Sequence, residues 1–320
     1  MKLVIQIPCL NEEKTLPETM KGIPGNIDGI DSVEVLVIDD GSSDGTSRAA
    51  KENGVTRVIR FNKTVGLARA FKAGIEEALR MGADIIVNTD ADNQYDGACI
   101  RDLVKPIMGK KADIVIGNRE ILKGMKHGIT KSVLQSFGSC IVSKLAGIKI
   151  NDATSGFRAF SRESALCLNI STDFSYTLES IIQAGEKGLV VSEVPVKTNR
   201  SMRKSRLFRN NLHYIKRSVG TLVKVYVAYE GFRIFLASGT VLFLSGVAFV
   251  FRYLYFYAFN LNPNGHIQSL IMASILITVG ILIMVLGLLA ELICSTRRVV
   301  DDILTKIKTG SDGKRPFNNI

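Results

Sequence analysis

The stretch Ile85-Ile-Val-Asn-Thr-Asp-Ala-Asp-Asn-Gln94 joins a short apolar run to a cluster of oxygen-bearing side chains. The run at its start, Ile85–Asn88, has the length and β-branched composition of a buried strand. Asp90 and Asp92 follow at once, and Gln94 comes two residues later. Carboxylate and carboxamide oxygens are hard ligands that suit Mg²⁺ or Mn²⁺. The stretch therefore predicts a strand that ends in a divalent-metal site, with an ordinary surface turn as the alternative.

Short runs of the same kind occur on both sides of this stretch. The further candidate strands are Leu3–Ile7, Val33–Ile38, Val55–Ile59 and Ile114–Ile116. Helical stretches lie between them, and the clearest, Gly66–Arg80, has apolar residues at the spacing of one helix face. This alternation predicts an α/β domain with a mostly parallel sheet and helices on both faces. Ligands of such sheets bind beyond the carboxyl ends of the strands, so the loops there form the candidate site.

Two more acidic loops follow the first two candidate strands. They are Pro8-Cys-Leu-Asn-Glu-Glu13 and Asp39-Asp-Gly-Ser-Ser-Asp-Gly-Thr46. The carboxylates of Asp39 and Asp40 can accept hydrogen bonds from a base and from a ribose hydroxyl. The Ser, Asp, Gly and Thr residues that follow also suit a plain capped turn before a helix, which is the alternative.

Several other classes of site are not indicated by the sequence. No GxxxxGK[ST] or GxGxxG motif occurs where a P-loop kinase or a dinucleotide-binding domain requires it. The five cysteines form no CxxC pair and leave an odd number, which favours reduced, mostly buried thiols over disulfides or metal ligands.

The chain of 320 residues has a formal net charge of +11, and its cations are concentrated. Between Lys197 and Arg217 there are eight Lys or Arg residues and no acidic residue. Because apolar runs follow, this cluster predicts a juxtamembrane segment attracted to anionic headgroups, with a solvated basic face as the alternative. Nucleic-acid binding would explain the charge but not the acidic loops or the apolar runs, so no nucleic-acid partner is expected.

Two long uncharged runs occupy the last third of the chain, at residues 234–251 and 267–290. Each is long enough to cross a hydrocarbon core of about 30 Å. The connection between them, residues 260–266, contains no Lys or Arg, whereas basic residues flank the outer ends. The positive-inside rule then places the N-terminal domain and the C-terminal tail in the cytoplasm.

These features predict four parts in a multi-pass protein of the cell (inner) membrane. They are an α/β domain at residues 1–206, interfacial amphipathic helices at 207–230, a transmembrane hairpin at 231–296 (spans at about 233–258 and 267–293) and a tail at 297–320. Glycines in the hairpin can mark close helix contacts, so a homo-oligomer is a possible assembly. These glycines are Gly239, Gly246, Gly280 and Gly287.

The motifs form a recognisable series along the chain. Its first members are Pro8…Asn11-Glu12, Asp39–Thr46, Asn62…Gly66 and Asp90–Gln94. This series resembles that of family 2 glycosyltransferases, which have a GT-A fold. The later motifs are Gly117-Asn-Arg119, Asp152-Ala-Thr-Ser-Gly-Phe-Arg158 and Arg200…Ser205-Arg206. They resemble the branch of dolichol-phosphate mannose synthase and the bacterial polyprenyl-phosphate sugar transferases. The resemblance covers essentially the whole chain and implies a Rossmann-like GT-A sheet followed by a two-helix transmembrane hairpin.

The resemblance also implies a role for each matching residue. A UDP- or GDP-linked sugar would be held by Pro8, Asn11, Glu12, Asp39, Asp40, Gly66, Asp90 and Ala91. The Mg²⁺ or Mn²⁺ ligands would be Asp90, Asp92 and Gln94. The acceptor phosphate would meet Arg119, Lys131, Ser136, Arg200, Ser205 and Arg206, and the catalytic residues would be Asp92, Arg119 and Arg206. Arg203 stands where relatives often have glycine, and Arg206 where lysine is common, so the basic charge of this segment is kept.

The implied reaction is metal-dependent, inverting transfer of a hexose or related sugar to polyprenyl phosphate at the cytoplasmic face of the membrane. A phosphate monoester with a second pKa of about 6 needs no general base, only positioning and relief of charge repulsion. Transfer to a polysaccharide or glycerolipid hydroxyl stays open, with Glu179 as the candidate base. A non-catalytic, membrane-tethered binder of nucleotide sugars is a further alternative. The chain has no tryptophan and hence no QxxRW segment, which argues against a processive synthase.

Overall fold

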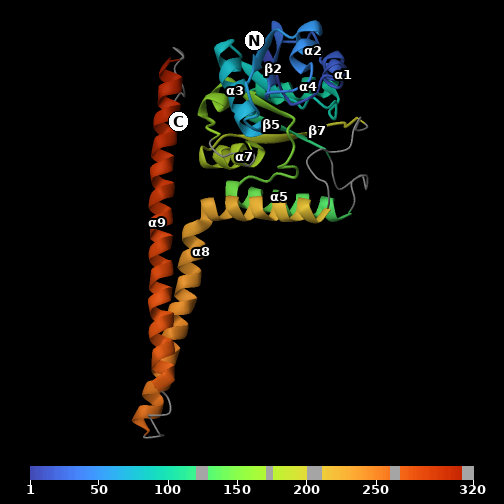
Figure 1. Cartoon of the computed structure of the whole chain (residues 1–320). Coiled ribbons are helices and arrows are strands. Elements are labelled where there is room, and N and C mark those ends of the chain that lie inside the picture. Colours follow the sequence, from blue (N-terminus) through green and yellow to red (C-terminus); the bar gives the residue numbers. More distant parts are fainter. Residues whose placement is uncertain (120–128, 171–175, 200–210, 260–266, 312–320) are drawn as a thin grey trace. The chain divides into compact units, whose positions relative to one another are not determined.

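The computed structural model describes residues 1–119, 129–170, 176–199, 211–259 and 267–311, without the side chains of 129–137, 211–230, 297, 298, 309 and 311. The chain forms two compact units. The first comprises residues 1–219 and 305–320, and the second comprises residues 220–304. Figure 1 shows the sheet within the first unit and a pair of long helices in the second.

A seven-stranded sheet, as far as the chain is described, forms the centre of the first unit. In chain order its strands are β1 (Lys2–Cys9), β2 (Ser32–Asp39), β3 (Arg57–Arg60), β4 (Ile85–Asn88), β5 (Ile114–Asn118), β6 (Arg158–Ser161) and β7 (Val191–Pro195). In space the order is β3-β2-β1-β4-β6-β5-β7. Strand β6 runs antiparallel to β4 and β5, and the other pairs are parallel. The predicted α/β class with a mostly parallel sheet is confirmed, and β6 and β7 are strands that the sequence did not indicate.

The strand order has a topological switch point where β1 meets β4. From β1 the chain moves outward to β2 and β3, and then returns to place β4 on the other side of β1. The loops at the carboxyl ends of β1 and β4 therefore leave in opposite directions, which opens a ligand site in sheets of this kind. The three acidic loops predicted above all lie at this edge.

Helices cover both faces of the sheet. The first unit contains α1 (Leu16–Gly22), α2 (Thr46–Glu52), α3 (Leu67–Arg80), the 3-10 turn η1 (Gly97–Cys99), α4 (Ile100–Met108), α5 (Ile129–Ala146), α6 (Arg162–Cys167) and α7 (Tyr176–Glu186), and of these α5 packs against α7. All residues of β4 are buried, as expected for a parallel strand covered on both faces. Helix α3 lies against the face that carries Gln6, and a Cβ at Gly74 would come within 2.3 Å of Gln6 Oε1. A glycine at this position therefore allows the close approach of α3.

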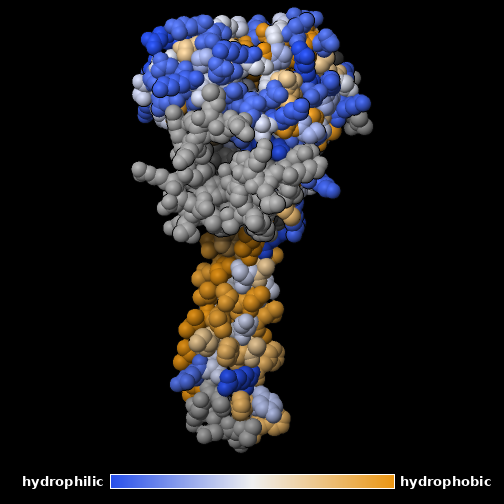
Figure 2. Space-filling model, turned by 90° about the vertical axis from the view of Figure 1, so that its right-hand side faces the viewer, coloured by the Kyte–Doolittle hydropathy of each residue, from blue (hydrophilic) through white to orange (hydrophobic). Residues whose placement is uncertain are grey.

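The second unit contains most of two long helices, α8 (Asn211–Ala258) and α9 (Ile267–Ser311). The segments Gly231–Ala258 and Ile267–Lys308 are long and apolar enough to cross a membrane. Figure 2 shows the apolar surface that extends along this pair. Helix α9 continues to Ser311, so much of the predicted tail is helical.

Three of the hairpin glycines allow α8 and α9 to pack closely against each other within one chain. A Cβ at Gly280 would lie 2.7 Å from the backbone nitrogen of Phe243 and 2.9 Å from the carbonyl oxygen of Gly239. A Cβ at Gly246 would lie 3.0 Å from the carbonyl oxygen of Ala273. Small residues of this kind let helix backbones approach each other in membranes. The close helix contacts expected at these glycines are therefore intramolecular.

The last turns of α9 belong to the first unit and contact it. The ammonium of Lys187 donates to the carbonyl oxygen of Cys167 at 2.5 Å and to Oγ1 of Thr305 at 3.3 Å. Lys308 Nζ donates to the carbonyl oxygen of Leu168 at 3.4 Å. The chain thus leaves the first unit after Val219 and returns to it at Thr305.

Replacing Gly280 by leucine should destabilise the helix pair by about 1–3 kcal/mol, because the new side chain overlaps the backbone of α8. Ala237→Leu, on the exposed side of α8, is the matched control and should change little. Thermal unfolding of the full-length protein in detergent, followed by circular dichroism, measures the difference. Equal melting temperatures for the two variants would contradict the packing described here.

Candidate active site

The loops after β1 and β2 are joined by hydrogen bonds. Asn11 has a left-handed backbone, with φ of 56°, and its Oδ1 accepts from the N–H of Ser43 at 2.8 Å. The N–H groups of Asn11 and Glu12 donate to the hydroxyls of Ser42 and Thr46, both at 2.9 Å. Glu12 itself is buried. Asn11 and Glu12, which are predicted to bind the nucleotide sugar, therefore lie in a connected wall formed by these two loops.

Asp39 and Asp40 are buried at the end of β2, where both accept hydrogen bonds from backbone N–H groups. Oδ1 of Asp39 accepts from the N–H of Ser42 at 2.8 Å. The two oxygens of Asp40 accept from the N–H groups of Val65 at 2.7 Å and Gly66 at 3.0 Å. Gly66 has a φ of 99°, which glycine adopts without strain. These residues, which are predicted to bind the nucleotide sugar, lie together, and their observed hydrogen bonds hold the loops around the site in place.

The turn after β4 presents the predicted metal ligands. The N–H of Gln94 donates to Oδ1 of Asp92 at 3.1 Å, and Asn93 between them has a left-handed φ of 55°. The carbonyl oxygen of Ala91 accepts from the hydroxyl of Thr19 on α1 at 3.0 Å. The turn is thus held from within and by α1, which fixes the direction of the Asp92 carboxylate. Pro8 is the remaining residue predicted to bind the nucleotide sugar, and it lies in β1 opposite Ile38 of β2.

The charges in this turn fit a divalent cation. Burial, reinforced by the negative charge of Asp92, raises the pKa of Asp90 to about 6, while the charge of Arg119 acts in the opposite direction. No three His, Cys, Asp or Glu side chains form a metal cluster in the described part of the chain. Two carboxylates and the carboxamide of Gln94 leave positions for water and phosphate oxygens, as Mg²⁺ and Mn²⁺ sites commonly do. The donor set therefore suits an ion that shares its coordination sphere with a substrate.

The segment that follows β7 lies along the turn at residues 90–94, called the metal turn because it carries the predicted metal ligands. The N–H of Asn199 donates to the carbonyl oxygen of Gln94 at 2.8 Å, and the N–H of Asp96 donates to the carbonyl oxygen of Lys197 at 3.2 Å. Nδ2 of Asn199 donates to the carbonyl oxygen of Asn93 at 3.2 Å. The described chain after β7 is therefore fixed to this turn as far as Asn199.

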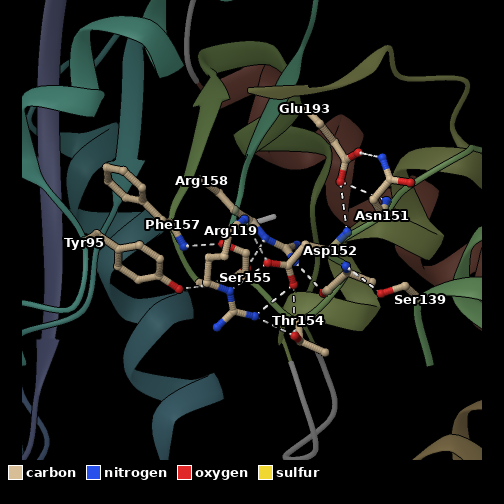
Figure 3. Close-up of polar contacts among 12 residues, drawn as sticks. Tyr95, Arg119, Ser139, Asn151, Asp152, Thr154, Ser155, Phe157, Arg158 and Glu193 are labelled. Carbon is tan, nitrogen blue, oxygen red and sulfur yellow. Dashed lines mark hydrogen bonds and ion pairs between the residues drawn. The ribbon is translucent and has the colours of Figure 1, made fainter. Parts of the chain in front are cut away.

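Arg119 directly follows β5 and forms a two-pronged ion pair with Asp152. Nε of Arg119 donates to Oδ2 of Asp152 at 2.7 Å, and Nη2 donates to Oδ1 at 2.8 Å (Figure 3). Nη2 also donates to the hydroxyl of Thr154 at 2.8 Å. The Arg119 side chain is 15% exposed and that of Asp152 is 1% exposed. Nη1 of Arg119 has no hydrogen-bond partner among the described residues, so this nitrogen is available to a ligand.

Arg158 fixes the backbone beside this pair. Its side chain is fully buried and donates to the carbonyl oxygens of Ala153, Ser155 and Thr177, each at 2.7 Å. It also donates to Ser180 Oγ at 2.7 Å. Burial lowers the pKa of Arg158 to about 10. Neutral oxygens from two elements thus hold a buried guanidinium, and the guanidinium in turn holds the loop that carries Asp152.

Gly156 brings the same loop against the metal turn. A Cβ at Gly156 would lie 2.8 Å from the hydroxyl of Tyr176, and 3.2 and 3.3 Å from the two carboxylate oxygens of Asp90. The N–H of Gly156 donates to the hydroxyl of Tyr95 at 3.3 Å, and its carbonyl oxygen accepts from Asn88 Nδ2 at 2.7 Å. Only a residue without a side chain fits here, so Gly156 joins the metal half of the site to the Arg119 half.

The other predicted acceptor residues lie partly or wholly outside the described residues. Lys131 and Ser136 belong to α5, but their side chains are not described. Ser139, one helical turn after Ser136, accepts from the N–H of Ala153 at 3.1 Å, so α5 borders the Asp152 loop. The predicted residues Arg200, Ser205 and Arg206 lie outside the described residues.

The structure adds site residues that the sequence did not indicate. Tyr95, Glu193 and Asn199 support the loops, yet two of them lie on or after β7, which has no clear strand pattern in the sequence. Glu179, the candidate base for a hydroxyl acceptor, is 4% exposed and accepts from Gln183 Nε2 at 3.3 Å.

Residues 4–168 match the family model described as Glycosyl transferase family 2. The chain is a member of this family. The transferase is 28% identical over 207 residues to the undecaprenyl-phosphate mannosyltransferase of Micrococcus luteus. The aligned region covers 61% of this chain and 83% of the relative. The transferase is also 29% identical over 215 residues to the UDP-N-acetylglucosamine–dolichyl-phosphate N-acetylglucosaminyltransferase of Methanococcus voltae, which covers 60% and 83%.

The transferase also has the fold of solved structures. One is glucosyl-3-phosphoglycerate synthase from Mycobacterium tuberculosis, crystallised with Mn²⁺, UDP and glucosyl-3-phosphoglycerate. The TM-score is 0.56 at 20% identity, and the match covers 70% of this chain and 78% of that chain. The expected GT-A-like fold is thereby confirmed.

Gly156→Ala should lower the turnover of the transferase roughly 10–100-fold, because the new Cβ displaces Tyr176 or Asp90, and small displacements of reacting groups are costly. Gly25→Ala is the control, since a Cβ at Gly25 meets no atom within 4 Å. Initial rates measure the effect, and melting temperatures show whether the variant folds. Normal turnover of Gly156→Ala would show that this close approach does not matter.

Asp152→Asn should destabilise the protein by about 3–5 kcal/mol at neutral pH, because it leaves the Arg119 charge buried without its partner. Burial alone would raise the pKa of Asp152, but the hydrogen bonds and charge of Arg119 outweigh it and hold the pKa below its ordinary value of 3.8. The stabilisation is therefore fully present above pH 3.8 and is lost as the pH falls through the lowered pKa.

Denaturant unfolding over a pH series checks this prediction. The free energies of unfolding of wild type and Asp152→Asn should converge at acid pH. Asp102→Asn, which removes an exposed ion pair with Lys105, is the control and should stay close to wild type throughout. A gap between wild type and Asp152→Asn that does not narrow toward acid pH would refute the ionised pair.

Proposed function

We propose that this transferase moves a hexose or related sugar from a nucleotide donor to polyprenyl phosphate, with inversion at the anomeric carbon and with a divalent metal ion. The observation that carries the proposal is a held cation beside an acidic turn. Arg119 is fixed by Asp152 and is close enough to Asp90 for its charge to affect the pKa of that carboxyl group. The names of the two sequence relatives, which specify lipid-phosphate acceptors, support the same reaction.

The donor side is assigned to the connected wall and the metal turn. Mg²⁺ or Mn²⁺ bound by Asp90, Asp92 and Gln94 would supply Lewis-acid relief of the charge on the donor diphosphate. The four segments at the carboxyl ends of β1, β2, β3 and β4 would surround a UDP- or GDP-linked sugar, and they contain Pro8, Asn11, Glu12, Asp39, Asp40, Gly66 and Ala91. The presence of Mn²⁺ and UDP in the mycobacterial synthase of similar fold supports this assignment.

The acceptor side is assigned to cations. Because the acceptor phosphate is mostly ionised near neutral pH, its oxygen needs orientation and charge relief rather than a general base. Nη1 of Arg119 is the donor that the described contacts leave for it. Arg200, Ser205 and Arg206 belong to the basic segment that starts beside the metal turn, and Lys131 and Ser136 belong to α5, which borders the Asp152 loop. These residues complete the proposed acceptor set.

The proposed organisation follows the hydropathy of the chain. Residues 1–206 form the catalytic domain, 207–230 an interfacial segment, 231–296 a transmembrane hairpin and 297–320 a tail that continues α9. Basic residues on the outer flanks of the hairpin favour a multi-pass protein of the cell membrane with its catalytic domain in the cytoplasm. A lipid-linked acceptor would then meet the site at the membrane surface.

The alternative acceptor, a sugar or lipid hydroxyl, requires a general base. Glu179 is the candidate for that role, but it is buried and hydrogen-bonded to Gln183. This observation favours the phosphate acceptor.

Incubating membranes with labelled UDP- and GDP-sugars and a short polyprenyl phosphate, with and without EDTA, tests the proposal. Mass spectrometry of the extracted lipid identifies both the sugar and the acceptor. We expect a sugar–phosphate lipid that forms only with free divalent metal. Label on a polymer or on a neutral lipid would support the hydroxyl acceptor, and binding without any product would support a non-catalytic binder.

Asp92→Ala should lower turnover by about 100-fold or more, since several kcal/mol of charge stabilisation are lost with the metal ligand. The variant should still fold and insert, because Asp92 accepts its hydrogen bond within its own turn. Asp28→Ala, in an exposed loop, is the control. Initial rates and the binding of Mn²⁺, measured by electron paramagnetic resonance, give the two readouts. Near-normal rates for Asp92→Ala would remove the metal assignment.

A further inference from the structure

Glu193 on β7 accepts three hydrogen bonds from one short segment. Its Oε1 accepts from the N–H groups of Asn151 at 2.9 Å and Asp152 at 3.0 Å, and its Oε2 accepts from Asn151 Nδ2 at 2.6 Å (Figure 3). Hydrogen bonds to a carboxylate are roughly twice as strong as bonds between neutral groups. A single side chain thus fixes the main chain at the residue that pairs with Arg119.

Asp152 links the segment bound by Glu193 to the side chain of Arg119. Its backbone N–H is bound to Glu193, while its carboxylate accepts both prongs of the guanidinium and, at 3.3 Å, the backbone N–H of Arg119. A shift of Asp152 would therefore turn the guanidinium and move Nη1. Hydrogen bonds therefore link Glu193 to Asp152 and Asp152 to Arg119 without a break.

The sheet fixes the two ends of this series of hydrogen bonds relative to each other. Strands β5 and β7 pair in parallel, with Ile116 opposite Glu193 and Asn118 opposite Pro195. Arg119 directly follows Asn118, so Arg119 and Glu193 are attached to neighbouring strands. Backbone hydrogen bonds hold those strands in register, and Asp152 bridges them from its loop.

From these contacts we propose that Glu193 is a positioning residue for the acceptor phosphate. It acts through Asp152 to hold the guanidinium of Arg119 in the orientation that leaves Nη1 for a phosphate oxygen. The inference rests on the proposed acceptor role of Arg119 and adds a residue that touches neither substrate.

Other contacts hold the loop when Glu193 is removed. Ser139 accepts from the N–H of Ala153, and Arg158 binds the carbonyl oxygens of Ala153 and Ser155. The loss of Glu193 should therefore loosen the residues before Ala153 and leave the rest of the loop in place. Its effect is expected in acceptor affinity rather than in folding.

The experiment compares Glu193→Ala and Glu193→Gln in the full-length protein in detergent. Ser192→Ala is the matched control, because Ser192 is the adjacent residue of β7 and its hydroxyl has no hydrogen-bond partner among the described residues. Isothermal titration calorimetry measures the affinity for geranylgeranyl phosphate, with uncharged geranylgeraniol as the reference ligand. Mn²⁺ affinity, from electron paramagnetic resonance, reports on the metal side.

We expect Glu193→Ala to weaken binding of geranylgeranyl phosphate on the order of tenfold, with geranylgeraniol and Mn²⁺ binding unchanged. Glu193→Gln keeps an oxygen that can accept from both backbone N–H groups, so it should retain most of the affinity. In an Arg119→Ala background, Glu193→Ala should have no further effect. Ser192→Ala should bind like wild type.

Two outcomes separate this inference from the function on which it rests. If Arg119→Ala itself leaves the affinity for geranylgeranyl phosphate unchanged, the acceptor role of Arg119 fails. If Arg119→Ala weakens binding but Glu193→Ala does not, the positioning role alone is overturned. An equal loss from Glu193→Ala with and without Arg119 would also overturn it, because the effect would then not pass through Arg119.

Discussion

A charged side chain that leaves water needs a partner, and this requirement organises the edge of the sheet where the candidate site lies. Asp39, Asp40 and Asp152 are each 4% exposed or less. Each accepts hydrogen bonds from backbone N–H groups or from a guanidinium on another part of the chain. Asp40 and Asp152 each fix two separate segments in this way, and the loops become a connected wall.

Asp90 and Asp92 differ from these carboxylates in what neutralises them. Arg119, which favours the ionised form of Asp90, is already paired with Asp152. The turn thus keeps a negative charge that the surrounding protein balances only in part. Under the proposed function, a cation that arrives with the diphosphate would complete this balance.

The sequence predicted the features that depend on local pattern. The β-branched runs predicted the first five strands, and the acidic pair after Ile85–Asn88 marked the turn where we propose a metal ion. Strands β6 and β7, with sequences RAFS and VSEVP, mix polar and apolar residues and exist because β4 and β5 pair with them. Glu193 could not be assigned from a pattern that did not reveal its strand.

Contacts between residues far apart in the sequence were the other feature that the sequence could not predict. Arg119 could be proposed as a site residue from its motif, but its bond to Asp152 spans 33 residues and follows only from the folded chain. The hairpin glycines carried a similar ambiguity, because their spacing is the same whether the neighbouring helix belongs to the same chain or to another copy. The structure resolves it through the contacts of Gly239 and Gly280 with each other.

The return of α9 to the first unit makes the hairpin an insertion rather than a terminal anchor. A soluble fragment that simply stops at Val219 would also delete Thr305 and Lys308, and with them hydrogen bonds to Lys187 and to the carbonyl oxygen of Leu168. A better soluble version would replace residues 220–304 by a polar linker and keep the last turns of α9. The catalytic unit would then retain a helical segment that lies far away in the sequence but belongs to its own fold.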